Sequence, residues 1–143
     1  MRSGTVIGPF TIDSVIGEGA MATVFSANHH IDDTVVALKV LRPEVAKQAS
    51  FLDAFGQEVR AAAGLHHRRI TAVFDHGVIT AAECEDQPEL VGSPWLAMEL
   101  VTGGTIGRLA GNIQWPQVQR ILLEVLDGLA HAHARMLIHR DIK

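Results

Sequence analysis

Three short runs of β-branched and aromatic residues, set close together near the start of the chain, constrain its fold more than any other feature. The runs cover residues 10–16, 23–28 and 35–41, and turn-forming residues separate each run from the next. Such runs are typical of β-strands. The sequence therefore predicts three strands that follow one another as an antiparallel meander.

The hydrophobic pattern changes its period at residues 50–65, where apolar side chains recur at the spacing of a helix. Ser50 and Asp53 are placed as a capping pair at the start of this helix. Gly64 suits its end, because glycine commonly follows the last helical turn. One helix is therefore expected within an otherwise β-rich part of the chain.

Two more strand-like runs, residues 72–80 and 94–100, lie on either side of an acidic loop. The acidic residues of this loop are Glu83, Glu85, Asp86 and Glu89. Runs of like charge are usually solvated, and we expect the same here. Together the runs predict an α+β unit, a five-stranded antiparallel sheet with one helix inserted.

A glycine-rich stretch at residues 101–107 predicts a linker or hinge, followed by a second, helical unit. Pro116 suits the first turn of a helix. The apolar stripe that follows consists of Val118, Ile121, Leu122, Val125, Leu129 and Ala132. Such a face needs a partner to cover it, and the short run 137–138 after it predicts one more strand.

The composition excludes several classes of function. The 143 residues are 48% hydrophobic and 20% charged, with a formal net charge of −4, so we expect a folded domain. The basic residues are scattered, and neither nucleic acid nor an anionic membrane is an expected partner. Cys84, the only cysteine, lies between two glutamates, and we expect it to be inert in a reducing compartment. The chain has no segment typical of a signal peptide or a membrane span, which predicts a cytoplasmic location.

Two glycines, Gly17 and Gly19, lie between the first two predicted strands. Such a pair is compatible with an ordinary hairpin, with a dinucleotide site or with a cover over nucleotide phosphates. A dinucleotide site needs a helix that begins near Ala20, whereas a strand-like run follows here. The oxidoreductase interpretation therefore fails on topology, and the other two interpretations stay open.

Lys39 is an unusual residue for a strand with so many apolar neighbours. Alternation places Lys39 on one face with Val35, Ala37 and Leu41. A charge in such surroundings needs a partner, and Glu58 on the predicted helix could supply it, because an unpaired ammonium in a cleft loses hydration without compensation. Spacing alone does not distinguish this arrangement from a solvated lysine and a glutamate at the edge of the helix.

The eight histidines do not have the spacing of metal ligands. His131 and His133 are two residues apart on a predicted helix and point in different directions. His66 and His67 form an adjacent pair in a predicted turn. We expect structural or solvated roles for these residues and no metal site among them.

The sequence "IHRDIK" at residues 138–143, after a long amphipathic helix, completes a set of motifs. Together with "GEGAMATV" at residues 17–24 and "VALK" at residues 36–39, it resembles the first part of a protein kinase domain over residues 10–143. The likeness is to bacterial serine/threonine kinases of eukaryotic type. It implies an N-lobe and hinge at residues 10–101 and the start of a helical C-lobe at residues 102–143.

The resemblance implies an ATP site built from the glycine loop, the lysine-bearing strand and the hinge. Its residues would be Ile16, Gly17, Glu18, Gly19, Ala20, Met21, Ala22, Thr23, Val24, Ala37, Lys39, Met98, Glu99 and Val101. Lys39 would contact the α- and β-phosphates, with Glu58 as its partner on the family's C helix. Met98 would be the gatekeeper, and Ala22 stands where the family has its third glycine.

Asp141 would act as the catalytic base toward the substrate hydroxyl, and Lys143 would contact the transferring phosphate. A lysine two residues after the aspartate is typical of serine/threonine-specific members. Arg140 resembles the arginine that pairs with a phosphorylated activation loop. Two departures from the family concern packing more than chemistry: no proline follows His67, and Met136 stands where glycine is common.

The resemblance implies ATP and Mg²⁺ as cofactors and proteins with serine or threonine as substrates, in a transferase of bacterial signalling. The metal is held in the family by an asparagine after the base and by an Asp-Phe-Gly aspartate, and residues 1–143 contain neither motif. We therefore expect the metal ligands to lie beyond residue 143 and this polypeptide alone to be an inactive fragment.

The remainder of a C-lobe, or another protein, is the expected partner of the helix at residues 116–135. The parent protein could carry a C-terminal membrane anchor. The alternative interpretation is a pseudokinase-like or remnant module that binds nucleotide or protein without catalysis. The intact Lys39, Glu58 and Asp141 favour the enzyme.

Overall fold

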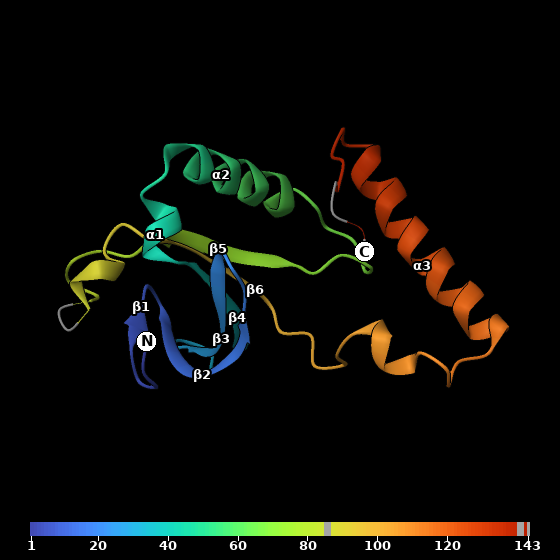
Figure 1. Ribbon diagram of the computed structural model, residues 1–143, viewed down its shortest axis with the longest axis horizontal. Helices are drawn as coiled ribbons and strands as arrows, with labels where there is room; N and C mark the ends of the chain where they lie inside the picture. Colours follow the sequence, from blue (N-terminus) through green and yellow to red (C-terminus); the bar gives the residue numbers. More distant parts are fainter. Residues whose placement is uncertain (85–86, 140–141, 143) are drawn as a thin grey trace.

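The computed structural model of the chain describes residues 1–84, 87–139 and 142 (Figure 1). The strands are β1 (Val6–Ile7), β2 (Phe10–Glu18), β3 (Ala22–His29), β4 (Val35–Leu41), β5 (Val73–Val78) and β6 (Pro94–Glu99). The helices are α1 (Pro43–Ala46), α2 (Ala49–Ala63) and α3 (Trp115–His133), with 3-10 turns at Pro88–Leu90 and Ile106–Leu109. Within the described residues, no helix is both long enough and apolar enough to cross a membrane.

The strands form one antiparallel sheet in the order β1-β2-β3-β4-β6-β5. The five predicted strands are all present, and the two-residue strand β1 adds a sixth at the edge beside β2. The sheet curls, α2 lies along one side of it, and α3 stands apart at the other end of the molecule (Figure 1). The predicted fold class, a kinase-like sheet with one helix followed by the first helix of a second unit, is confirmed.

Alternation along β4 divides the core into two clusters. Val36, Leu38 and Val40 are each at most 2% exposed and join a cluster around Phe25 and Trp95 on one face. On the other face, the second cluster consists of Leu41, Phe55, Val59 and Leu96. The helical residues in this cluster come from α2, so the face that carries the odd-numbered residues of β4 is the face that α2 covers.

The start of α2 differs from the prediction. Gln48 precedes the first helical residue, and no side chain caps this end. The predicted capping pair of Ser50 and Asp53 is wrong, because the helix begins at Ala49 and Ser50 therefore lies inside its first turn. Gly64 ends the helix as predicted.

The start of α3 agrees with the prediction and adds a capping box. Pro116 occupies the first turn, and the side chains of Gln114 and Gln117 exchange hydrogen bonds with each other's backbone N–H groups. The predicted strand at residues 137–138 is not formed. The apolar stripe of α3 is only partly covered, since Leu122 and Val125 are 50% and 41% exposed.

The acidic loop after β5 is tied to the sheet through Glu83. Its carboxylate accepts hydrogen bonds from the backbone N–H of Gly8 and from the hydroxyl and N–H of Thr80. Burial raises the pKa of this carboxyl, but the hydrogen bonds from Thr80 and Gly8 outweigh it and lower the pKa overall. The expectation of a merely solvated loop is therefore wrong for Glu83, while Glu85 and Asp86 lie outside the described residues.

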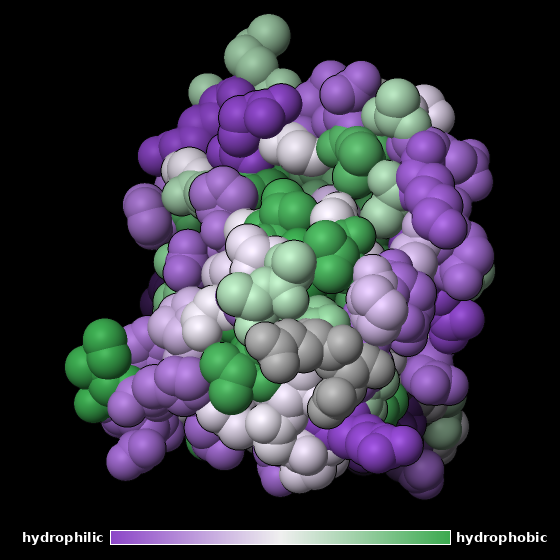
Figure 2. Space-filling view, turned by 90° about the vertical axis from the view of Figure 1, so that its left-hand side faces the viewer, coloured by the Kyte–Doolittle hydropathy of each residue, from purple (hydrophilic) through white to green (hydrophobic). Residues whose placement is uncertain are grey.

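Cys84, next to Glu83, is 4% exposed. Burial raises the pKa of its thiol, and the charges of Glu83 and Glu89 raise it further. The thiolate is therefore disfavoured, as the sequence predicts. Figure 2 views the molecule from the side that carries the loop after β5. Hydrophobic side chains gather in the centre of this face, and hydrophilic ones surround them.

The indole of Trp95 packs against the backbone at two glycines, Gly77 in β5 and Gly8 in the turn between β1 and β2. Gly77 is the cross-strand neighbour of Trp95, and a Cβ added to Gly77 would lie 2.6 Å from Cζ2 of the ring. A Cβ added to Gly8 would lie 2.9 Å from the same atom. Both glycines are therefore needed because the ring occupies the space of their side chains.

We expect Gly77→Ala to lower the free energy of unfolding by about 1–3 kcal/mol, because the methyl group overpacks the Trp95 site. Gly103→Ala is the matched control: nothing lies within 4 Å of an added Cβ there, and its φ is not left-handed. The control should change stability by less than about 0.5 kcal/mol. Urea unfolding of both variants measures the difference, and equal effects would contradict the role given to Trp95.

Candidate functional site

The glycine pair lies in a hairpin between β2 and β3. Gly17 is opposite Val24 and Glu18 is opposite Thr23, and the N–H of Gly19 donates to the carbonyl of Ala22 at 2.9 Å. Neither glycine has a left-handed φ, and added Cβ atoms would have nearest neighbours at 3.7 and 3.4 Å. The hairpin itself therefore does not require two glycines, since a small side chain fits at either position with little or no adjustment.

The face of the sheet behind this hairpin carries several of the predicted site residues. Val24 is the cross-strand partner of Lys39, and Ala37 is the partner of Met98. Directly opposed residues of antiparallel strands point to the same face, and alternation puts Ala37 and Lys39 together. Val24, Ala37, Lys39 and Met98 therefore share one face, on which Ala37 is buried and Lys39 half-buried.

Helix α2 packs on that same face. Phe55 and Val59, 8% and 2% exposed, join Leu41 and Leu96 in the second core cluster. Leu96 is the other cross-strand partner of Lys39. Glu58 lies on α2 between Phe55 and Val59. The backbone of Glu58 is therefore on the side of the sheet that carries Lys39.

The hinge that the family resemblance implies, Glu99 to Val101, begins where β6 ends. The N–H of Glu99 donates to the carbonyl of Ala72 at 2.9 Å, and its carboxylate accepts from the N–H of Ala72 at 3.3 Å. Val101 beyond it is 62% exposed, and Ile16 near the glycine hairpin is 48% exposed. Glu99 is therefore held to the segment before β5, while the side chains of Val101 and Ile16 are open to solvent.

The segment predicted to be catalytic lies mostly outside the described residues: Arg140, Asp141 and Lys143 are among those not described. The chain leading to it reverses at the end of α3. The N–H of Met136 donates to the carbonyl of His133 at 2.9 Å, and the N–H of Leu137 donates to that of Ala132 at 3.0 Å. These are the two bonds of a Schellman motif, with Met136 at the left-handed position and φ of 62°.

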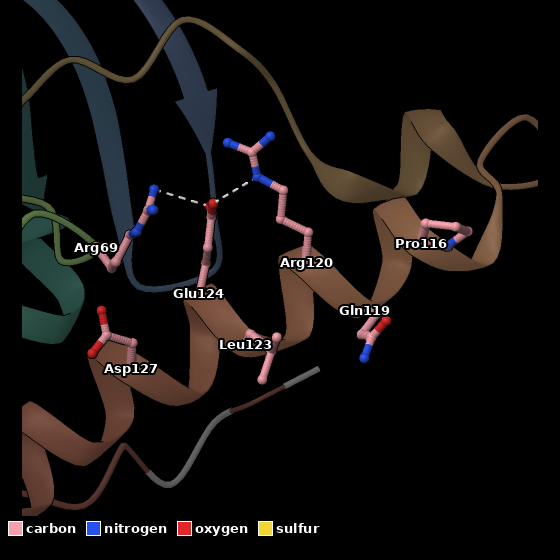
Figure 3. Close-up of a pocket in the computed structure, with 7 residues that line it drawn as sticks. All are labelled: Arg69, Pro116, Gln119, Arg120, Leu123, Glu124 and Asp127. Atoms are coloured by element: carbon pink, nitrogen blue, oxygen red, sulfur yellow. Dashed lines mark hydrogen bonds and ion pairs between the residues drawn. The ribbon is translucent and has the colours of Figure 1, made fainter.

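One pocket lies away from all of the predicted site residues. Arg69 and one side of α3 line it, and in Figure 3 the side chains of Arg69 and Arg120 converge on Glu124. The guanidinium groups lie 3.0 and 3.2 Å from the carboxylate oxygens of Glu124. Asp127 adds a second acid to the lining, so the charges balance and the pocket has no excess of either sign. No sequence pattern predicts the pairing of Arg69 with Glu124, since the two residues are more than fifty positions apart.

Comparison with known proteins identifies the family. Residues 10–143 match the model of the protein kinase domain. The chain therefore belongs to the protein kinase family, among the bacterial serine/threonine kinases of eukaryotic type, and is similar to transferases of that class.

Curated relatives include serine/threonine-protein kinase PknF of Mycobacterium tuberculosis, 34% identical over 148 residues, and PrkC of Bacillus subtilis, 30% identical over 141 residues. The alignments cover 100% and 96% of this chain but 29% and 20% of those proteins. The crystal structure of the M. tuberculosis PknI kinase domain matches the whole chain with a TM-score of 0.78 at 30% identity, over 55% of its own length. The chain thus spans about half of a solved kinase domain.

We expect Met136→Gly to stabilise the end of α3 by about 1 kcal/mol, because a side chain in the left-handed conformation is strained and glycine is not. The amide of Leu137 should then exchange with solvent about fivefold more slowly, the factor that corresponds to that free energy. Met136→Ala is the control, since alanine keeps the Cβ and should leave the exchange rate nearly unchanged. Equal rates in all three proteins would contradict the left-handed assignment.

Proposed function

We propose that the protein containing this chain is an ATP-dependent serine/threonine protein kinase, which transfers the γ-phosphate of ATP to serine and threonine hydroxyls of protein substrates. The observation that carries the proposal is the common face of Val24, Ala37, Lys39 and Met98, with α2 packed on the same side. The kinase relatives support the reaction class.

ATP would supply the γ-phosphoryl group, and the residues around the common face fit it. The hairpin from Gly17 to Val24 would lie over the phosphates, where bare glycine backbone allows N–H groups to approach the oxygens closely. Close approach to phosphate oxygens would account for Gly17 and Gly19, which the hairpin geometry itself does not require. Ala37 is small enough to leave room for the adenine ring, whose edge would meet the backbone from Glu99 to Val101. Ile16 and Met98 would form further walls of the same pocket.

Lys39 would hold the α- and β-phosphates, with Glu58 orienting its ammonium. Asp141 would accept the proton of the substrate hydroxyl, and Lys143 would neutralise charge on the transferring phosphate. These roles rest on the family's motifs. Mg²⁺ would neutralise phosphate charge, and the residues that hold it in the family do not occur in residues 1–143. We therefore propose that a polypeptide of these 143 residues does not catalyse the transfer by itself.

A second candidate function is binding of nucleotide or protein without catalysis. One observation favours it: α3 exposes apolar side chains on more than one side, with Leu123 and Leu126 59% and 58% exposed in addition to the predicted stripe. Such a surface is a common feature of protein contacts. Retention of Lys39, Glu58 and Asp141 favours the enzyme over this candidate.

Phosphate incorporation from Mg-ATP by the full-length protein containing this chain tests the proposal. We expect Lys39→Ala and Asp141→Asn each to lower the rate by at least about 100-fold, since positioned charges and general bases contribute on that scale. Lys47→Ala and Asp13→Asn are matched controls at exposed positions of the same residue types. No incorporation by the unaltered protein, or equal loss in the controls, would overturn the enzyme assignment and leave the binding module.

A separate measurement addresses the 143-residue polypeptide. We expect ATP to raise its unfolding free energy little or not at all, because the phosphate charge meets Lys39 and backbone N–H groups without the family's metal ligands. Thermal unfolding with increasing Mg-ATP measures this. An increase of about 2.7 kcal/mol, the value for a ligand at a hundred times its Kd, would show that residues 1–143 form a complete nucleotide site.

A further inference from the structure

The loop at residues 64–72, which joins α2 to β5, touches the C-terminal half of α3. Gly128 makes this possible: it is buried, and an added Cβ would lie 3.3 Å from the carbonyl oxygen of Arg69 and 3.5 Å from a side-chain carbon of Ile70. Arg69 also forms an ion pair with Glu124 of α3 (Figure 3). We call this region, residues 64–72 against α3, the loop–helix contact.

Two imidazole rings stack within the loop–helix contact. The rings of His67 from the loop and His131 from α3 have their centroids 4.6 Å apart and are inclined by 30°. Stacking at this distance is favourable for neutral rings. Two imidazolium rings would instead place like charges against each other at a separation where repulsion is substantial.

The neighbours of the two rings fix the position of each proton. The backbone N–H of Arg69 donates to Nδ1 of His67, with the nitrogens 3.3 Å apart. The guanidinium of Arg135 lies 3.3 Å from Nδ1 of His131 and can only donate. Both Nδ1 atoms are therefore acceptors, so each neutral ring carries its proton on Nε2.

A second proton on either ring must go to Nδ1, where a donor already points. Protonation of His131 would therefore break its hydrogen bond and place a positive ring against the charge of Arg135. Nε2 of His131 is buried and finds no hydrogen-bond partner in the described part of the chain. Burial lowers the pKa of His131, and the charges of Arg135 and His67 lower it further.

The charged and titratable groups that face the stacked rings come from both sides of the contact. They are His66 and Arg69 from the loop, Glu124 and Asp127 from α3, and Arg135 from the turn after α3. Asp127 favours a charged ring, but its side chain is 59% exposed and its oxygen is 3.5 Å from Nε2 of His67, so solvent screens it. Glu124 is already shared by two arginines. Histidine is the side chain that ordinarily changes charge between pH 5 and 8, which makes the stacked rings the groups that this inference concerns.

We propose that the loop–helix contact is a pH-sensitive switch, closed while His67 and His131 are both neutral and opened when a ring is protonated. Because the pKa of His131 is lowered in the contact, the unstacked state binds the proton more readily. The contact therefore has its full stability above the ordinary histidine pKa of about 6.5 and loses stability as the pH falls below it. Below the lowered pKa of His131, the stability of the contact no longer changes with pH. This inference does not depend on phosphoryl transfer.

The test is an NMR titration of the 143-residue chain between pH 8 and 5, which reports ring tautomers and the contact between protons of Arg69 and Gly128. At pH 8 we expect the Nε2–H tautomer in both rings and a nuclear Overhauser effect between Arg69 and Gly128. On acidification we expect this effect to be lost together with the titration of His131. A contact that persists at pH 5 with both rings protonated, or Nδ1–H tautomers at pH 8, would overturn the proposal.

Matched variants separate the stacked pair from other histidines. Asparagine can keep an acceptor near the position of Nδ1 but does not titrate, so His131→Asn should retain the contact to lower pH than the unaltered chain. His133→Asn alters an exposed histidine on the same helix and should leave the pH of opening unchanged. Unchanged opening in His131→Asn, or a shift in His133→Asn, would contradict the switch. If His131→Asn fails to form the contact at pH 8, the tautomers and titration of the unaltered chain decide the question.

Discussion

Burial of strand β4 on both faces is the constraint on which the rest of the structure depends. Its even-numbered residues close one core against Trp95, and Leu41 meets α2 on the other side. A strand in the middle of a sheet with both faces covered has little tolerance for a charge. Lys39 nevertheless occupies this strand, half-buried, at the point where the cover by α2 meets the hairpin of Gly17 and Gly19. The proposed phosphate site follows from that placement.

The sequence was sufficient to predict the sheet and α2 because each depends on a local period. Alternation marks the strands, and helical spacing of Phe55 and Val59 marks the side of α2 that meets the sheet. The cross-strand register then brings Val24 and Met98 beside Lys39 and Ala37, an arrangement that the family resemblance implied before the register was known. The roles of Glu58, Asp141 and Lys143 remain predictions, since the family's motifs alone carry them.

Features that depend on contacts across the chain could not be predicted in the same way. Glu83 belongs to a run of acids that is typical of a solvated loop, yet it accepts a hydrogen bond from Gly8, seventy-five residues away. The run at residues 137–138 has the composition of a strand, but Met136 turns the chain at the end of α3, and residues 137–138 do not form a strand. The stacking of His67 on His131 likewise has no sequence signature, because it requires the close approach that Gly128 permits.

The two long helices are attached by different kinds of interaction, and this difference determines how each responds to its surroundings. Helix α2 presents apolar side chains to the sheet, and such burial is nearly independent of pH. Helix α3 instead meets the loop at residues 64–72 through ion pairs and imidazoles, while much of its apolar stripe stays uncovered. Partly exposed ion pairs contribute about 0–1 kcal/mol each. Because these interactions stabilise the attachment of α3 only weakly, protonation of one stacked ring is enough to destabilise the loop–helix contact. The attachment of α2 has no such sensitivity, since it depends on buried apolar side chains.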